Sequence, residues 1–131
     1  MTDENKKRIL IIDDDTVALN SLKELLALSG YAVETIQDTK GDIMRRIKAF
    51  SPHIILLDLL MPHIGGFEVC ELLNKDKETQ GIPVIIVSAL LKDADVKRAY
   101  RLGIIGYVTK PYDFSKLLQE INKALASKEN A

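Results

Sequence analysis

The sequence of 131 residues has no tryptophan, a single cysteine, four prolines and no long uninterrupted apolar run. Because Cys70 has no second cysteine to pair with, an internal disulfide is excluded. The longest apolar stretch, HIILLDLLMPHI, is interrupted by Asp58 and Pro62 and is too short to span a bilayer. The opening residues, MTDENKKR, are polar where a secretory signal would be apolar. These absences predict a cytoplasmic protein with no membrane segment.

An excess of charge of one sign is also missing. Eighteen Lys and Arg residues against nineteen Asp and Glu residues give a formal net charge of −1, so no global field favours a nucleic acid or an anionic membrane as partner. The apolar share of 47% and the charged share of 28% are typical of a folded globular chain. The length predicts one domain over residues 1–131, with a core at about 8–127 and polar tails.

Short apolar runs rich in β-branched residues alternate with segments of helical period. Strands are predicted at 8–12, 31–36, 53–58, 82–88 and 105–110, and a helix with apolar residues at i, i+3, i+4 spacing follows each of them. The third and fourth runs are continuously apolar, as central parallel strands are, whereas the second is half polar and suits a sheet edge. This order predicts an α/β fold, a doubly wound parallel sheet of five strands with helices on both faces.

Polar side chains stand where the predicted strands end. Asp13 and Asp14 follow the first strand, Asp58 ends the third, Ser88 the fourth and Lys110 the fifth. Ligands bind at the carboxyl ends of the strands in such sheets, so we expect these groups to share one rim. Asp58 is a lone acid in an apolar run, where burial without a partner would be unfavourable.

Each acid also has a purely structural interpretation. Asp15 is predicted to cap the following helix. A turn residue is the structural alternative for one of Asp13 and Asp14, and a satisfied turn acceptor is the structural alternative for Asp58. Clustered carboxylates nevertheless repel one another and need a compensating cation. Three acids with a lysine and a hydroxyl suit Mg²⁺ and a phosphoryl group, and a carboxylate is a known phosphoryl-accepting nucleophile.

The sequence resembles the receiver domain of two-component response regulators, in its single-domain form that is similar to chemotaxis regulators. The matching pieces are ILIIDDD, IILLDLLMPHIGG, PVIIVSA and YVTKP, which occur in the family's order and spacing over about residues 8–127. The resemblance implies a flavodoxin-like fold with strand order 2-1-3-4-5. It also implies a phosphorylation-dependent signalling switch that catalyses only its own phosphorylation and slow autodephosphorylation.

The resemblance implies a role for each site residue. Asp58 would accept a phosphoryl group from a phosphohistidine of a sensor histidine kinase or a phosphotransfer protein. The other implied roles are Mg²⁺ ligands for Asp13, Asp14, Asp58 and the carbonyl of Leu60, the switch hydroxyl for Ser88, the site lysine for Lys110, the switch aromatic for Tyr107, and a cis peptide bond before Pro111.

The implied switch works through charge. Added phosphate would draw Ser88 inward and let Tyr107 turn, which would reshape the face formed by residues 92–126 for an unknown downstream protein or output domain. The basic residues of the helix at 92–103 are predicted to be a solvated face and not a nucleic-acid patch; they are Lys92, Lys97, Arg98 and Arg101.

Two departures from the family pattern lead to expectations of their own. Gly65 and Gly66 replace an acid–glycine pair, which predicts a more flexible loop that touches no expected ligand. Leu60 and Leu90 are apolar where residues near the phosphoryl group influence hydrolysis, which predicts slow loss of the phosphoryl group.

Two other functions remain open. DDDTV also fits the D-x-D-x-[TV] pattern of haloacid-dehalogenase-like phosphatases, with Asp13 as nucleophile and Asp15 as acid/base, but this gives Asp58 no role and lacks the later acidic motif. A phosphorylation-independent interaction module is the third possibility. His53 and His63 are predicted to be surface residues and Cys70 a core residue. The tail ASKENA follows the last helix with no output segment, so the sequence leaves open a stand-alone receiver or a part of a larger regulator.

Overall fold

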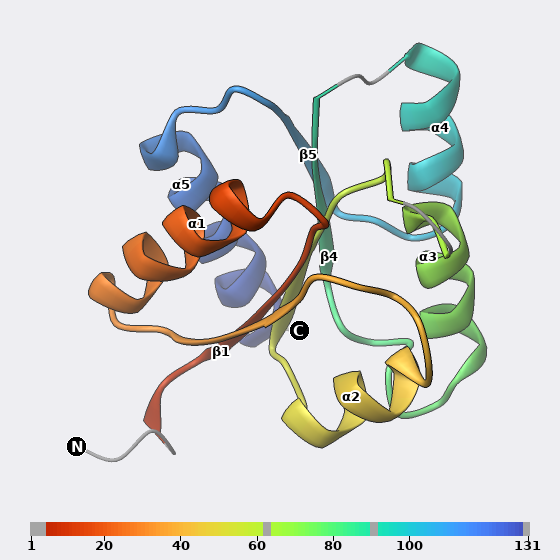
Figure 1. Cartoon of the computed structure of the whole chain (residues 1–131), viewed down its shortest axis with the longest axis horizontal. Helices are drawn as coiled ribbons and strands as arrows, with labels where there is room; N and C mark the ends of the chain where they lie inside the picture. The colour runs from red at the N-terminus through yellow and green to blue at the C-terminus, as the bar shows by residue number, and fades with distance from the viewer. Residues whose placement is uncertain (1–4, 62–63, 90–91, 130–131) are drawn as a thin grey trace.

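The computed structural model describes residues 5–61, 64–89 and 92–129, which alternate strand and helix along the chain (Figure 1). The strands are β1 (Arg8–Ile12), β2 (Ala32–Ile36), β3 (Ile54–Leu57), β4 (Val84–Ser88) and β5 (Gly106–Thr109). The helices are α1 (Thr16–Leu28), α2 (Ile43–Phe50), α3 (Gly66–Lys75), α4 (Asp93–Arg101) and α5 (Phe114–Glu129).

The strands form one parallel sheet in the order β2-β1-β3-β4-β5. Helices α1 and α5 cover one face of the sheet, and α2, α3 and α4 cover the other (Figure 1). The predicted fold class and strand order are therefore confirmed. Among the described residues, no helix combines the length and the apolar composition needed to cross a bilayer.

The alternation of side chains along each strand builds two cores. Ile9 and Ile11 point to the face covered by α1 and α5, whereas Leu10 and Ile12 point to the face covered by α2, α3 and α4. All four are almost fully buried, and each such side chain contributes about 1.5–3 kcal/mol by leaving water. A continuously apolar strand is thus required wherever helices cover both faces.

The edge strands differ from the central ones as expected. β2 is mostly half-buried or exposed, which confirms the edge position predicted from its polar residues. β5 forms the other edge and alternates between buried Gly106 and exposed Tyr107. Because β1, β3, β4 and β5 run in the same direction, the residues that follow them meet at one rim, and the site lies there.

Candidate functional site

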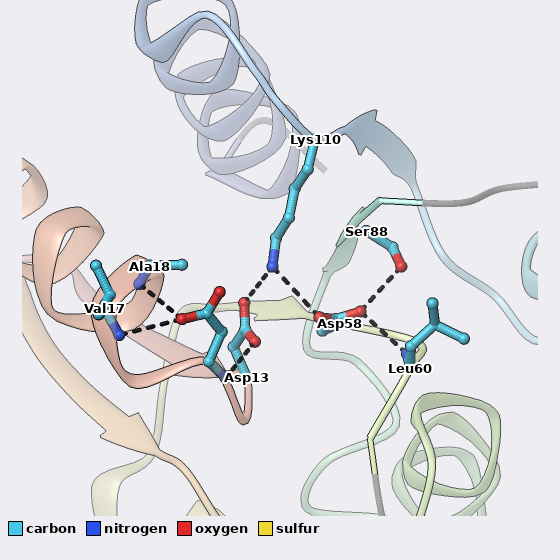
Figure 2. A network of polar contacts seen from close by, with 8 residues as sticks. Asp13, Val17, Ala18, Asp58, Leu60, Ser88 and Lys110 are labelled. Atoms are coloured by element: carbon cyan, nitrogen blue, oxygen red, sulfur yellow. Dashed lines mark hydrogen bonds and ion pairs between the residues drawn. The ribbon is translucent and has the colours of Figure 1, made fainter.

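A lysine side chain from the end of β5 bridges the carboxylates that follow β1 and β3 (Figure 2). Lys110 Nζ lies 2.6 Å from Asp13 Oδ2 and 3.3 Å from Asp58 Oδ2. The two acids are only 6% and 7% exposed, so their charges need a close partner. The protein itself supplies the compensating cation that the clustered acids require.

Burial and pairing act in opposite directions on these groups. Burial raises the pKa of Asp13, and hydrogen bonds with Lys110 and the backbone of Asp15 offset that rise only in part. Burial alone would lower the pKa of Lys110, but the hydrogen bond to Asp13 and the charges of Asp58 and Asp13 outweigh it, so the pKa is raised. Lys110 is therefore a cation at neutral pH.

The second oxygen of Asp58 is held from the opposite side. Ser88 Oγ donates to Asp58 Oδ1 at 2.9 Å, and the Leu60 backbone N–H donates to the same oxygen at 3.0 Å (Figure 2). Ser88 is fully buried at the end of β4. The Asp58 carboxylate is thus fixed by a cation, a hydroxyl and an amide, each from a different part of the chain.

Ser88 and Tyr107, the two residues for which a switch role is predicted, differ in their orientation relative to the site. Phosphate is predicted to draw Ser88 toward the site. In this structure the Ser88 hydroxyl already contacts the Asp58 carboxylate. Tyr107 is 44% exposed and packs edge-to-face with Tyr100 of α4, with 6.1 Å between ring centroids. The outward Tyr107 and the inward Ser88 therefore coexist in this structure.

The acidic run after β1 divides between two tasks. Asp15 accepts hydrogen bonds from the backbone N–H groups of Val17 and Ala18 and is the N-cap of α1, as predicted. Asp13 Oδ1 accepts from the Asp15 backbone N–H at 3.0 Å, and the exposed Asp14 stands beside them. The carboxylate of Asp15 is therefore occupied by the helix end, while Asp13 and Asp14 face the rim.

The donor set fits a hard divalent cation. Carboxylate oxygens of Asp13, Asp14 and Asp58 all lie within 4.8 Å of one another. Mg²⁺ prefers oxygen ligands, needs only one or two carboxylates and retains several waters, and the exposed Asp14 leaves one side open to solvent. The residues present are thus compatible with the Mg²⁺ that receiver domains bind at an acidic pocket.

Several residues in the loops around the site were singled out from the sequence. The Lys110–Pro111 peptide bond, for which the resemblance implies a cis geometry, is cis in the structure. Leu60, which is expected to lie near the phosphoryl group, has a side chain that is 55% exposed. Leu90 and His63, the other loop residues singled out from the sequence, lie outside the described residues.

Gly66 lies against the backbone of Asp58, a close approach that the sequence did not predict. It begins α3 directly after the segment that follows β3, and a Cβ at this position would lie 2.7 Å from both the Asp58 carbonyl oxygen and the Leu59 Cα. Gly66 is therefore needed for a close backbone approach to Asp58. Gly65 differs, because its Cβ would meet mainly the mobile end of Glu68.

Arg98 is exposed, as predicted for a solvated face, and its guanidinium also lies 4.1 Å from the ring centroid of Phe67 and 3.7 Å from Glu71, both on α3. The surface prediction for His53 needs correction. His53 is half-buried, and its Nδ1 accepts a hydrogen bond from the Arg8 backbone N–H. The core assignment of Cys70 is confirmed, and burial, with a smaller effect of the Glu71 charge, raises the thiol pKa to about 11.

Sequence analysis missed Thr39, which lies in the connection between β2 and α2. Its side chain is buried, and its hydroxyl is hydrogen-bonded to the backbone of Ile64 in the loop that follows Asp58. A threonine between a polar aspartate and a lysine carries no pattern of its own, so only the folded structure shows the contact.

Comparison with known proteins agrees with this geometry. The model of the response regulator receiver domain family matches residues 9–122. Protein PilH of Pseudomonas aeruginosa is 37% identical over 119 residues, covering 91% of this chain and 98% of PilH. The DNA-binding dual master transcriptional regulator RpaA of a Synechocystis species is 35% identical, and the match spans 48% of its length. The crystal structure of a CheY-like receiver domain protein from Methanospirillum hungatei is 31% identical, with a TM-score of 0.88 over 96% of this chain and 98% of that one.

The chain belongs to the response regulator receiver domain family. Members of this family are phosphorylation-dependent signalling switches of two-component systems, and that is the function of this chain.

Proposed function

We propose that Asp58 is the phosphoacceptor of this receiver. The observation that carries the proposal is the environment of its carboxylate, which is buried, hydrogen-bonded by Ser88 and Leu60 on one oxygen and paired with Lys110 on the other. A carboxylate held in this way has a fixed orientation toward an incoming phosphoryl group. The Leu60 N–H contact is the one that a simple turn acceptor would make, but such an acceptor needs neither Lys110 nor the buried Ser88 hydroxyl.

The chemical step is a phosphoryl transfer between two protein groups. A carboxylate oxygen of Asp58 forms a bond to phosphorus while the bond from phosphorus to the imidazole nitrogen of a phosphohistidine breaks, and the electron pair of that bond stays on the imidazole. Lys110 supplies positive charge beside the transferred group, and the Ser88 hydroxyl donates to it. The histidine belongs to a sensor histidine kinase or a phosphotransfer protein.

Asp13, Asp14 and Asp58, with the backbone carbonyl of Leu60, would hold Mg²⁺, and the ion would neutralise charge on the phosphoryl oxygens. The Leu60 amide is already hydrogen-bonded to Asp58, which fixes the peptide adjacent to the acceptor. The chain's part is therefore to keep the acid oxygens converged and close to Lys110.

The output step concerns the face formed by residues 92–126. After phosphorylation the Ser88 hydroxyl would leave the carboxylate for a phosphoryl oxygen, and Tyr107 would leave its exposed position against Tyr100. The downstream partner is a protein or an output domain that reads this face.

We assign the chain no direct nucleic-acid contact. We place its single domain, with a core at about 8–127, in the cytoplasm.

The phosphatase alternative is less favourable. Its acid/base would be Asp15, whose carboxylate caps α1 through two backbone N–H groups. Its nucleophile would be Asp13, which would leave the buried Asp58 and its hydrogen bond from Ser88 without a role. A phosphorylation-independent module would leave the buried, paired Asp58 unexplained.

Intact-protein mass spectrometry after incubation with Mg²⁺ and a small acyl phosphate tests the proposal. The parent should gain one phosphoryl group, Asp58→Asn should gain none, and the control Asp113→Asn, at an exposed helix-capping position, should match the parent. An adduct of equal yield in Asp58→Asn contradicts the proposal. Hydrolysis of phosphate esters that persists in this variant favours the phosphatase.

Slow autodephosphorylation is part of the same proposal, because the apolar Leu60 and Leu90 offer no group to orient an attacking water. A Leu60→Asn, Leu90→Glu variant should lose its phosphoryl group faster than the parent. The decay of the phosphorylated mass with time measures both rates. Equal rates in the parent and the variant would count against a role of Leu60 and Leu90 in slowing hydrolysis.

A further inference from the structure

A buried hydroxyl joins the connection after β2 to the loop that follows Asp58. Thr39 is only 2% exposed, although its neighbours Asp38 and Lys40 are exposed. Its Oγ donates to the Ile64 carbonyl oxygen at 3.1 Å and accepts from the Ile64 backbone N–H at 3.2 Å. One side chain thus satisfies both backbone groups of a residue 25 positions further along the chain.

The loop that Thr39 holds carries part of the site. At its start, the Leu60 N–H donates to Asp58 Oδ1 at 3.0 Å, and at its end the Gly66 N–H donates to the Leu59 carbonyl at 3.2 Å. Both of these bonds lie within the segment from β3 to α3. The bonds from Thr39 attach this loop to a different element, and Ile64 also packs against the core.

We propose that Thr39 is a positioning residue for Mg²⁺, acting through the loop that presents the carbonyl of Leu60. This inference rests on the proposed function, in which that carbonyl and the three acids hold the ion. Mg²⁺ requires near-ideal octahedral geometry at short distances, so a small displacement of one ligand weakens binding. Residues that orient ligands without touching the ion commonly change metal affinity when they are substituted.

A hydroxyl is required because an apolar side chain of the same shape would remove both hydrogen bonds. Thr39→Val keeps the volume but leaves the Ile64 N–H and carbonyl without their partner. The loop would then shift to find other partners or water, and Leu60 would move with it. Thr39→Ser keeps the hydroxyl and should keep the loop in place.

The chain offers a matched control at a second buried threonine. Thr79 is 1% exposed, and its hydroxyl donates to the Leu73 carbonyl oxygen at 2.8 Å. It lies before the start of β4, whereas the site lies beyond the end of that strand. Thr79→Val therefore removes a comparable buried hydrogen bond without touching the loop after Asp58.

The experiment titrates the unphosphorylated full chain with Mg²⁺ and follows the dissociation constant by backbone amide chemical shifts, with thermal unfolding measured in parallel. Thr39→Val should bind Mg²⁺ about tenfold more weakly than the parent, the lower end of the range for lost outer-shell partners. Thr39→Ser should lie within about twofold of the parent on the same scale. Thr79→Val should unfold at a lower temperature and bind Mg²⁺ like the parent.

Parent-like Mg²⁺ affinity in Thr39→Val, with stability lost as in Thr79→Val, overturns the proposal and leaves the hydroxyl a purely structural role. Weakened affinity in Thr39→Ser equal to that of Thr39→Val also overturns it. If the parent itself neither binds Mg²⁺ nor is labelled at Asp58, the proposed function fails and this inference fails with it. If the parent binds Mg²⁺ and is labelled but Thr39→Val behaves like it, only this inference fails.

Discussion

Asp58 illustrates, at the scale of single residues, how a buried acid can be retained in an apolar strand. An unpaired buried carboxylate would be strongly unfavourable, but Lys110, Ser88 and the Leu60 amide satisfy its two oxygens. A group satisfied by three separate parts of the chain has one orientation. The same contacts that make burial tolerable therefore orient the carboxylate for the proposed phosphoryl transfer.

The close approach of Gly66 gives the first residue-scale prediction. Gly66→Ala places a Cβ 2.7 Å from two backbone atoms of the Asp58–Leu59 segment, so the backbone must shift. We expect a loss of about 1–3 kcal/mol in the free energy of unfolding, as for other overpacked sites, together with slower labelling by acyl phosphate. Denaturant unfolding and intact-mass time courses measure the two effects.

Gly65→Ala is the matched control, because its Cβ would meet chiefly a flexible glutamate side chain and its φ of −78° is open to any residue. It should keep stability and labelling close to those of the parent. Equal damage from both substitutions would show that the pair acts through loop flexibility, as the sequence first indicated.

The sequence was sufficient to predict the environment of residues that interrupt or flank a regular pattern of apolar residues. Asp58 stood out because an acid interrupted an apolar strand, and Asp15 because it preceded a helix. Thr39 and Gly66 gave no such signal, since their roles depend on contacts between elements that only folding brings together. The contact of Arg98 with Phe67 was not predicted for the same reason, because Phe67 lies on another helix.

At the scale of elements, the start of α1 separates the receiver from the phosphatase alternative. Asp15→Ala removes an N-cap that accepts two hydrogen bonds and should lower the free energy of unfolding by about 1 kcal/mol. Asp15→Asn retains an oxygen for the cap and should be closer to the parent in stability. Both should still be labelled at Asp58.

Loss of labelling or of phosphate-ester hydrolysis in Asp15→Asn, with stability preserved, would instead identify Asp15 as an acid/base. Stability from denaturant unfolding and labelling from intact mass therefore answer different questions in one pair of variants. The account predicts that only the stability changes, and only in Asp15→Ala.

A second element-scale feature links α3 to α4. Arg98 of α4 lies over Phe67 and near Glu71 of α3, while Phe67 follows the glycine that contacts Asp58. Such exposed contacts contribute only about 0.5–1 kcal/mol each, so they bias α4 without locking it. This modest attachment is suitable for a helix that belongs to the proposed output face.

At the scale of the whole molecule, the fold followed from the sequence because two requirements coincide. Continuous apolar strands need helices on both faces, and parallel strands bring the residues at their carboxyl ends to one rim. The alternating runs therefore predicted the sheet and the position of the site together. Strand ends were less well predicted, since β3 stops at Leu57 and the acid that follows lies outside the strand.

Global stability should respond to the buried thiol of Cys70 at high pH. Its pKa is raised from 9.0 to about 11 in the folded protein, so the unfolded chain ionises first as the pH rises. The parent should lose roughly 2–3 kcal/mol of unfolding free energy between about pH 9 and 11 from this group alone.

Cys70→Ala lacks the titrating group and provides the comparison. The stability advantage of the parent over Cys70→Ala, from denaturant unfolding at each pH, should shrink across that range. A constant difference from pH 8 to 11 would mean that the thiol is not shielded by the core.

The location of the phosphoryl group tests the central claim most directly. Borohydride reduces an aspartyl phosphate to homoserine, so the labelled parent can be reduced, digested and sequenced by tandem mass spectrometry. The account predicts homoserine at position 58 and at no other aspartate. Homoserine at position 13, or a labelled protein without homoserine at 58, would contradict it.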